Sequence, residues 1–218
     1  SSVRRFNHLF RSRYGMNPTA MRRGTAAAEA GRVVLKLGYR PPLHWEGLAG
    51  FLSSRGATVV ERVDRGVYRR TVQVGETTGW LQAEPDTGKH QLRLTVSESL
   101  VPMLRHLLSG VRHLFDLNAS PAAIDAYLGQ DALMAGFVQR APGLRIPGAL
   151  DGFEVALRAI LGQQISVKAA TTVFGRFAQT FGRPVDTPWP ELSRAAPTAE
   201  VLAQAPLQQI IDQGMTQR

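Results

Sequence analysis

Two amphipathic stretches, separated by a short polar and uncharged segment, constrain the fold of this chain more than any other feature. In the first stretch apolar residues recur at i, i+3, i+4, i+7 and i+8, at Phe153, Ala156, Leu157, Ile160 and Leu161. The second stretch begins after Ser166, a good N-cap residue, and places Val167, Ala170, Val173, Phe174 and Phe177 at helical spacing. A period of 3.6 residues is typical of helices that bury one face. The sequence therefore predicts two packed helices joined by an exposed turn, Gly162-Gln163-Gln164.

The composition limits the class of protein. A chain of 218 residues can hold one large or two small domains, and 44% hydrophobic with 20% charged residues is typical of a folded, soluble protein. The absence of cysteine excludes a disulfide framework, a thiolate zinc site and a cysteine nucleophile, and is compatible with the cytoplasm. The sequence has neither a run of about 18 apolar residues nor a signal-peptide core, so we expect no contact with a membrane.

Positive charge is concentrated at the N-terminal end. The net charge is +9, and residues 1–23 contain six arginines and no acidic residue. Such a segment favours contact with nucleic acid, because the phosphate backbone attracts clustered arginines. A solvated basic tail is the alternative interpretation.

The middle of the chain predicts a small α+β domain at residues 32–117, preceded by a linker at 24–31 that is rich in small residues. Strands are expected at 33–37, 58–63, 67–74, 78–84 and 91–96, and helices at 45–55 and 100–117. Gly56 is expected to end the first helix, and the short connections predict an antiparallel sheet. His44 and Trp45 are interpreted as packing residues.

Residues 118–218 are predicted to be all-helical. Helices are expected at 121–128, 132–139, 198–203 and 207–212 besides the central pair, with Ser120 as the cap of the first and a proline-containing loop at 183–197. The fold class is thus α+β followed by all-α.

Familiar catalytic patterns are missing. No histidine and acidic residues recur at metal-ligand spacing, and there is neither a Gly-x-Ser-x-Gly turn nor a glycine-rich phosphate loop. We expect no metal and no cofactor. Asp125, Asp151 and Glu154 are interpreted as helix caps or surface charges, and Asp151 directly precedes a helix.

Three segments nevertheless resemble known families. The run from Gly143-Leu-Arg-Ile-Pro-Gly148 to Arg158-Ala-Ile-Leu-Gly-Gln-Gln-Ile-Ser166 is similar to the opening of the catalytic domain of AlkA-type 3-methyladenine DNA glycosylases, which belong to the helix-hairpin-helix superfamily. Tyr39-Arg-Pro-Pro42, Trp45 and Gly50-Phe51-Leu52 resemble the N-terminal domain of the same enzymes. Residues 1–23 resemble the C-terminal end of an AraC-type helix-turn-helix domain.

The glycosylase resemblance implies base excision from double-stranded DNA that contains alkylated purines, by flipping the damaged base into an aromatic pocket. It implies that Phe51 forms a wall of this pocket, although helical spacing alone favours a core residue. It also implies that Gln164 fills the gap in the base stack with Gln163 beside it, and that Ser166 and Lys168 contact DNA. Family members can carry an apolar wedge, so glutamine is a departure that could alter the lesion preference.

The helix-turn-helix resemblance implies that Val3, Arg4, Arg5 and His8 face promoter DNA, with the recognition helix isolated from the rest of its domain. Phe6, Leu9 and Phe10 would pack inward.

Two parts of the glycosylase pattern are not matched. The family's hairpin is spelled Leu-Pro-Gly-x-Gly, and the nearest string, Ile146-Pro147-Gly148-Ala149-Leu150, lacks its second glycine. The catalytic aspartate is expected beyond Arg218, so we expect residues 118–218 to be the first part of a catalytic domain and the fragment itself to be inactive. The expectation for the intact protein is a cytoplasmic, monomeric regulator fused to a glycosylase.

Two alternatives remain open from the sequence. The first is a transcription regulator whose glycosylase-like region binds DNA without catalysis. The second is a basic module that binds DNA non-specifically through its phosphates.

Overall fold

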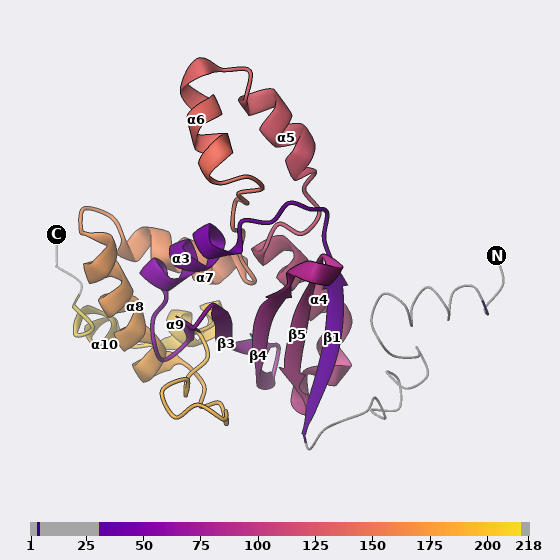
Figure 1. Cartoon of the computed structure of the whole chain (residues 1–218). Coiled ribbons are helices and arrows are strands. Elements are labelled where there is room, and N and C mark those ends of the chain that lie inside the picture. The colour runs from indigo at the N-terminus through magenta and orange to yellow at the C-terminus, as the bar shows by residue number, and fades with distance from the viewer. Residues whose placement is uncertain (1–3, 5–30, 215–218) are drawn as a thin grey trace.

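The computed structural model describes Arg4 and residues 31–214 (Figure 1). Val3, Arg5 and His8, predicted to contact promoter DNA, lie outside the described residues. Arg4 is helical and exposed, but its neighbours lie outside the described residues, so the recognition helix and the linker stay predictions.

A five-stranded antiparallel sheet forms the centre of the first half. Its strands are β1 (Arg32–Gly38), β2 (Glu61–Asp64), β3 (Val67–Val74), β4 (Thr77–Asp86) and β5 (Gln91–Ser97). They lie in the order β1-β5-β4-β3-β2, so β1 closes one edge beside the last strand, with Leu35 opposite Leu94. The strict alternation along β1 buries Val33, Leu35 and Leu37, as a period of two requires of a half-buried strand.

Two helices cover the apolar side of this sheet. Helix α3 (Trp45–Arg55) follows β1, and α4 (Leu104–Leu114) follows β5 after a 3-10 helix, η2 (Glu98–Met103). Leucines of α4 and the buried side chains of β1 and β5 belong to one hydrophobic cluster with Trp45 and Phe115. Burial of this continuous apolar area is the main source of stability for the sheet layer.

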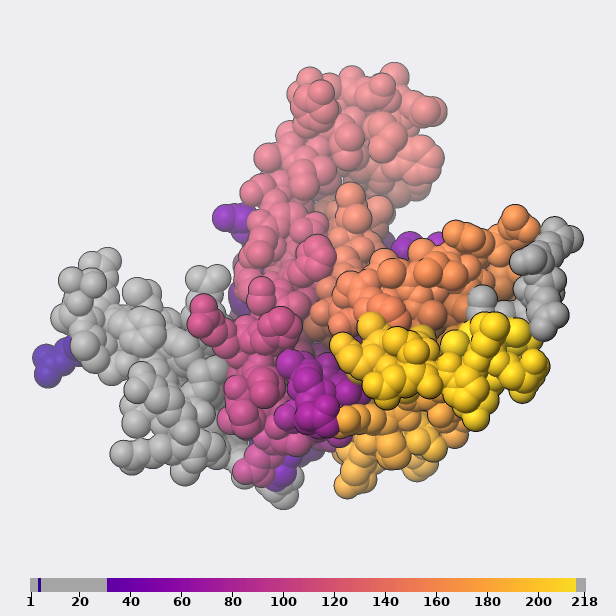
Figure 2. Space-filling view, turned by 180° about the vertical axis from the view of Figure 1, so that it is seen from behind, coloured from indigo at the N-terminus to yellow at the C-terminus, as the bar shows by residue number. Residues whose placement is uncertain are grey.

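The second half is helical. It contains α5 (Pro121–Leu128), α6 (Ala132–Arg140), α7 (Gly152–Leu161), α8 (Val167–Phe181), α9 (Ala199–Gln204) and α10 (Leu207–Ile211). A second hydrophobic cluster joins α7 and α8 to Ala57 and Val60 of the loop before β2, so the helices pack against the sheet layer. Helices α5 and α6 project from the body, as both the front and the back views show (Figures 1 and 2).

Two predicted elements were wrong at their ends, and one predicted helix cap is absent. The strand expected at 58–63 begins only at Glu61, because the amides of Val60 and Glu61 both donate to the carbonyl of Ala57 and close a turn. The helix expected at 100–117 is split by Pro102, which lies in η2, and α4 ends at Leu114. Ser120 precedes α5 but its side chain makes no capping hydrogen bond, and Pro121 starts the helix instead.

The buried face of α7 also differs from the prediction. Leu157 and Leu161 are buried as expected, but Ala156 and Ile160 are exposed, and the carboxylate of Glu154 takes a buried place on this face. The interpretation of Glu154 as a cap or surface charge was therefore wrong. Its partners, described below, give the reason.

Candidate functional site

A cavity of about 390 Å³ opens between α3, the loop before α7, and helices α7 and α8. Phe51 and Arg55 line it from α3, whereas Gly162 and Ile165 line it from the turn between α7 and α8. Phe51, predicted to bind a base, and the two residues that flank the predicted wedge thus line the same cavity, although more than a hundred residues separate them in the chain.

Phe51 is an exposed aromatic at the edge of this cavity. Its side chain is 42% exposed, while Trp45, Leu48 and Leu52 of the same helix are buried. The core position favoured by helical spacing is therefore wrong for Phe51. The guanidinium carbon of Arg55 lies 3.9 Å from the centre of the Phe51 ring, a cation–π distance. One face of the ring is held by Arg55 and the residue is directed toward the cavity rather than the core.

The turn between α7 and α8 is exposed and tightly bent. Gln163 and Gln164 are both exposed, and Gln164 has φ +62°, a left-handed conformation that costs a residue with a Cβ about 1 kcal/mol or more. Strained backbone of this kind is concentrated at functional sites. Neither glutamine side chain lines the cavity, so the turn presents them to the outside.

Ser166 and Lys168 begin α8. The hydroxyl oxygen of Ser166 accepts a hydrogen bond from the amide of Ala169 at 3.2 Å, so Ser166 is the predicted N-cap. Lys168 is the second residue of α8 and is exposed. Among the described residues, none makes a contact that holds its side chain against the protein surface.

Sequence reasoning missed a buried cluster of charges beneath the cavity. Arg70 of β3 contacts Glu154 of α7 at 2.7 Å and Glu61 of β2 at 3.8 Å. Arg158 of α7 contacts both carboxylates, Glu61 at 2.7 Å and Glu154 at 2.8 Å. The hydroxyl of Tyr68 donates to Glu61. Two carboxylates and two guanidinium groups therefore neutralise one another across the boundary between the sheet and the helices.

The electrostatics of the cluster follow from burial and pairing. Burial by itself raises the pKa of Glu154, but Arg70 and Arg158 outweigh it, so this pKa lies below the ordinary glutamate value. Burial lowers the pKa of Arg70, but Glu154, Tyr68 and Glu61 raise it well above the ordinary value. Burial and the neighbouring Glu61 raise the pKa of Tyr68 well above its ordinary value. Glu154 and Arg70 are therefore both held charged at neutral pH.

Arg158 connects this cluster to the walls of the cavity. Its guanidinium carbon lies 3.7 Å from the centre of the Phe174 ring on α8, and Nη1 donates to the carbonyl of Arg55 at the end of α3. The same side chain thus contacts α3, β2, α7 and α8. The signal available in the sequence was the pair Glu154 and Arg158, four residues apart on one helical face.

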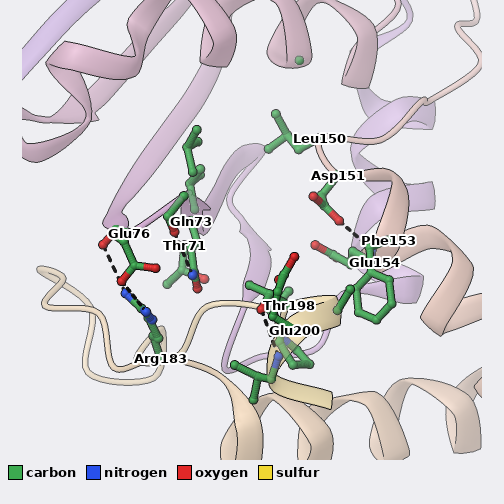
Figure 3. A pocket seen from close by; sticks show the side chains of 18 of the residues that line it. Thr71, Gln73, Glu76, Leu150, Asp151, Phe153, Glu154, Arg183, Thr198 and Glu200 are labelled. Carbon is green, nitrogen blue, oxygen red and sulfur yellow. Dashed lines mark hydrogen bonds and ion pairs between the residues drawn. The ribbon is translucent and has the colours of Figure 1, made fainter. Parts of the chain in front are cut away.

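A larger cavity of about 680 Å³ lies on the other side of the charge cluster, and Arg70 and Glu154 line both cavities. Figure 3 shows its mixed lining, with the ion pair of Glu76 and Arg183 on one side and Thr198 and Glu200 at the start of α9 on the other. Asp151 caps α7, as predicted, by accepting from the amide of Glu154 at 2.7 Å.

Other polar residues have structural roles. Asp125 accepts from the amide of Gly143 at 2.8 Å, so it fixes a loop and caps no helix terminus. His44 was expected to pack, but its Nδ1 accepts from the amide of Gly47 and caps α3. Trp45 is buried as predicted, and its Nε1 donates to the carbonyl of Gly66.

Residues 31–214 hold no group of three or more histidine, aspartate or glutamate side chains arranged to bind a metal ion. Within the same part of the chain, every helix is too short or too polar to cross a membrane.

Curated relatives match over most of this chain. The probable bifunctional transcriptional activator/DNA repair enzyme AlkA of Mycobacterium tuberculosis is 37% identical over an alignment of 213 residues, which covers 94% of this chain and 42% of that protein. DNA-3-methyladenine glycosylase 2 of Escherichia coli is 37% identical over 179 residues, 82% of this chain and 61% of that enzyme. The chain thus spans about half the length of the curated relatives it matches.

The fold is shared with a solved structure, the 3-methyladenine DNA-glycosylase from Archaeoglobus fulgidus. Its TM-score is 0.69 at 19% identity, over 83% of this chain and 62% of that one. Residues 34–151, more than half of the 218, match the family described as the AlkA N-terminal domain. This match includes all of the sheet except the first two residues of β1, both of its covering helices and the loop that leads into α7, so the chain belongs to the AlkA N-terminal domain family.

Proposed function

We propose that this protein is a DNA glycosylase that hydrolyses the N-glycosidic bond of alkylated purines of the 3-methyladenine type. The observation that carries the proposal is the 37% identity with the E. coli glycosylase. A match over 179 residues of a 218-residue chain necessarily includes both Phe51 and Gln164. The cavity between these two positions then receives the flipped base.

Base flipping explains the exposed glutamine turn. An enzyme that acts on a base within a duplex must extrude the nucleotide, and unstacking costs a few kcal/mol. A side chain that enters the stack offsets part of this cost. Gln164 is suited to this role because the strained turn holds it away from the protein and because its amide can hydrogen-bond the unpaired partner base.

The aromatic wall of the cavity suits the proposed substrate. An alkylated purine carries positive charge, which favours contact with an aromatic face. Arg55 already occupies one face of Phe51, so we infer that the base uses the other face. Positive charge on the purine also makes it a good leaving group.

We further propose that a helix-turn-helix precedes this module and binds promoter DNA through Val3, Arg4, Arg5 and His8. A match over 94% of the chain must include residues before the sheet, and the M. tuberculosis relative that gives this match is named a transcriptional activator as well as a repair enzyme. The arginine-rich composition of residues 1–23 supports the same proposal.

The direct test is an excision assay. The full-length protein is incubated with methylated duplex DNA, and the released bases are separated by chromatography. We expect 3-methyladenine in the supernatant at a rate above the spontaneous background. Binding of the duplex without release of any methylated purine would contradict the glycosylase proposal and leave the non-catalytic regulator.

Gln164→Ala is expected to lower kcat/KM for excision from duplex DNA about tenfold, because the gap left by the flipped base is no longer filled. Gln164→Gly should lower it to a similar degree without lowering stability, since relief of about 1 kcal/mol of left-handed strain offsets the extra entropy that glycine loses. Gln130→Ala, an equally exposed glutamine between α5 and α6, is the control. Unchanged excision by both Gln164 variants would refute the wedge assignment.

Phe51→Ala is expected to reduce excision of 3-methyladenine by about tenfold or more while changing the free energy of unfolding by less than about 1 kcal/mol, because the ring is half exposed. Phe137→Ala is a closely matched control. Phe137 is also an exposed aromatic, and the guanidinium carbon of Arg140 lies 4.8 Å from its ring centre, but it lies on the projecting α6. Equal activity losses in the two variants would show that Phe51 has no special role at the cavity.

A further inference from the structure

A second candidate site lies at the far edge of the sheet. An open pocket of about 380 Å³ is formed where the end of β1 meets the end of α4 and the connection between β4 and β5, which contains the 3-10 helix η1 (Thr87–Lys89). In Figure 1, β1 and α4 lie on the opposite side of the molecule from α8. This pocket shares no lining residue with the Phe51 cavity.

The charge of this pocket is one-sided. Four cationic side chains line it, each from a different segment: Lys36 of β1, Arg40 of the following loop, Lys89 of η1 and Arg112 of α4. Among the described residues that line it, none is acidic. Asp86 is near enough to influence Tyr39 and accepts a hydrogen bond from Gln91, but it does not line the pocket. A small volume lined by several cations attracts an anion.

Neutral acceptors orient the two arginines. Nη1 of Arg40 donates to the carbonyl of Asn118 at 2.6 Å. Arg112 donates to the side-chain oxygen of Asn118 at 2.6 and 2.9 Å and to the carbonyl of Gly38 at 3.2 Å. These bonds fix the guanidinium groups at the pocket wall.

The two lysines, Lys36 of β1 and Lys89 of η1, supply the other two positive charges of the pocket. Lys36 lies directly opposite Arg93 in the β1–β5 register, a like-charge pair that is unfavourable on a sheet surface. Arg93 is compensated by Glu84 on the next strand, whereas both Lys36 and Lys89 are exposed. Lysine acts as a mobile point charge and arginine as a planar fork, a combination suited to tetrahedral oxyanions.

We propose that this pocket binds a phosphate group, and that its source is the backbone of duplex DNA beyond the lesion. The assignment to phosphate stands on the lining alone, while the assignment to the DNA backbone rests on the proposed function. An open pocket fits a phosphodiester that belongs to a long chain, and four cations from rigid elements give it a fixed position. The DNA contact would thereby extend from the cavity to the sheet layer.

The test removes the two lysine charges without touching the proposed base pocket. Lys36→Gln/Lys89→Gln is compared with the parent protein and with Arg65→Gln/Arg105→Gln, which removes two exposed charges outside this pocket. Binding of an undamaged duplex by the full-length protein is measured between about 50 and 200 mM salt. Loss of two phosphate contacts makes the fall of log K with log salt less steep by about 1.8. Over this range of salt, the affinity of the parent should therefore fall about twelvefold more than that of the lysine variant.

A second arm identifies the source of the phosphate. Inorganic phosphate is titrated into the parent and the lysine variant in a calorimeter. A reduced salt slope in the lysine variant but not in the control assigns the pocket to the DNA backbone. Phosphate binding that the variant loses, with an unchanged slope, supports the phosphate site and assigns it to a small anion. An unchanged slope together with no phosphate binding overturns the proposal.

Failure of this inference is distinct from failure of the glycosylase proposal. Excision by the parent protein is measured on the same preparation, and the phosphate titration needs no excision activity. The parent protein could excise methylated purines while all three proteins show the same salt slope and phosphate gives no heat. This result would contradict only the phosphate site and would leave the glycosylase proposal standing.

Discussion

Gly143→Ala is expected to lower the free energy of unfolding by about 3 kcal/mol or more. Gly143 has φ +73°, and a Cβ placed there would lie 2.4 Å from the carbonyl oxygen of Pro42 and 2.5 Å from its carbonyl carbon. Both atoms belong to the backbone and cannot rotate away as a side chain could. Left-handed strain costs about 1 kcal/mol and overpacking of this kind another 1–3 kcal/mol.

The loss would spread because Gly143 joins two segments. Its amide donates to Asp125 of α5, and its carbonyl accepts from the amide of His44 just before α3. The nearby Arg145 is buried and donates to the carbonyls of Asp116 and Arg40. Displacing Gly143 therefore disturbs the start of the helix that carries Phe51.

Gly66→Ala separates strain from steric overlap. Gly66 has φ +75°, almost the same as Gly143, but an added Cβ would meet no atom within 4 Å. This variant should lose only about 1 kcal/mol. Denaturant unfolding of the parent and both variants, followed by circular dichroism, measures the difference. Equal losses in the two variants would show that the close approach to Pro42 contributes nothing.

Glu154→Gln is expected to lower the free energy of unfolding at pH 7 by about 3 kcal/mol, because it leaves the buried guanidinium of Arg70 with too little negative charge. Arg158 would lose the same partner and with it part of the link between α3, α7 and α8. Glu76→Gln is the control. Glu76 is paired with Arg183 on the surface and is 86% exposed, so its loss should cost no more than about 1 kcal/mol.

The pH dependence gives a second readout of the same cluster. The folded-state pKa of Glu154 lies below the ordinary value, so its contribution to stability is present above the unfolded-state pKa of about 4.3. This contribution is lost as the pH falls through the folded-state pKa. The stability difference between the parent and Glu154→Gln should therefore be largest near neutral pH and shrink below about pH 4.3. A difference that stays constant down to pH 3 would contradict a lowered pKa of Glu154 in the folded protein.

Local sequence patterns predicted the strands well, because successive side chains of a strand point to opposite faces of the sheet. The alternation of Val33, Leu35 and Leu37 follows directly from the two-residue period of a strand with one buried face. The start of β2 was missed because the turn at Ala57 is closed by backbone hydrogen bonds, which leave no mark in the side-chain pattern. The start of α4 was missed because Pro102 lies in a separate 3-10 helix, which the apolar spacing does not distinguish from an α-helix.

The candidate site was predictable only in part. The spacing of apolar residues and the polar Gly162-Gln163-Gln164 segment predicted two helices with an exposed turn, and the structure has both. The conformation of Gln164 could not be predicted, because a left-handed residue other than glycine depends on what holds the turn in place. Helical spacing placed Phe51 wrongly in the core, whereas the structure places it at the edge of a cavity. Its role as a wall of a base pocket stays a prediction.

The sequence by itself determined the helical and strand periods, the exposed turn, the basic N-terminal segment and the family, since each depends on neighbours along the chain. Only the tertiary structure decided which face of α7 is buried. Glu154 is stable in the interior because Arg70, 84 positions away, neutralises it there. The basic pocket likewise exists only because four cations from separate segments converge. Charge pairing depends on distance in space, and that distance is set by how the sheet and helices pack.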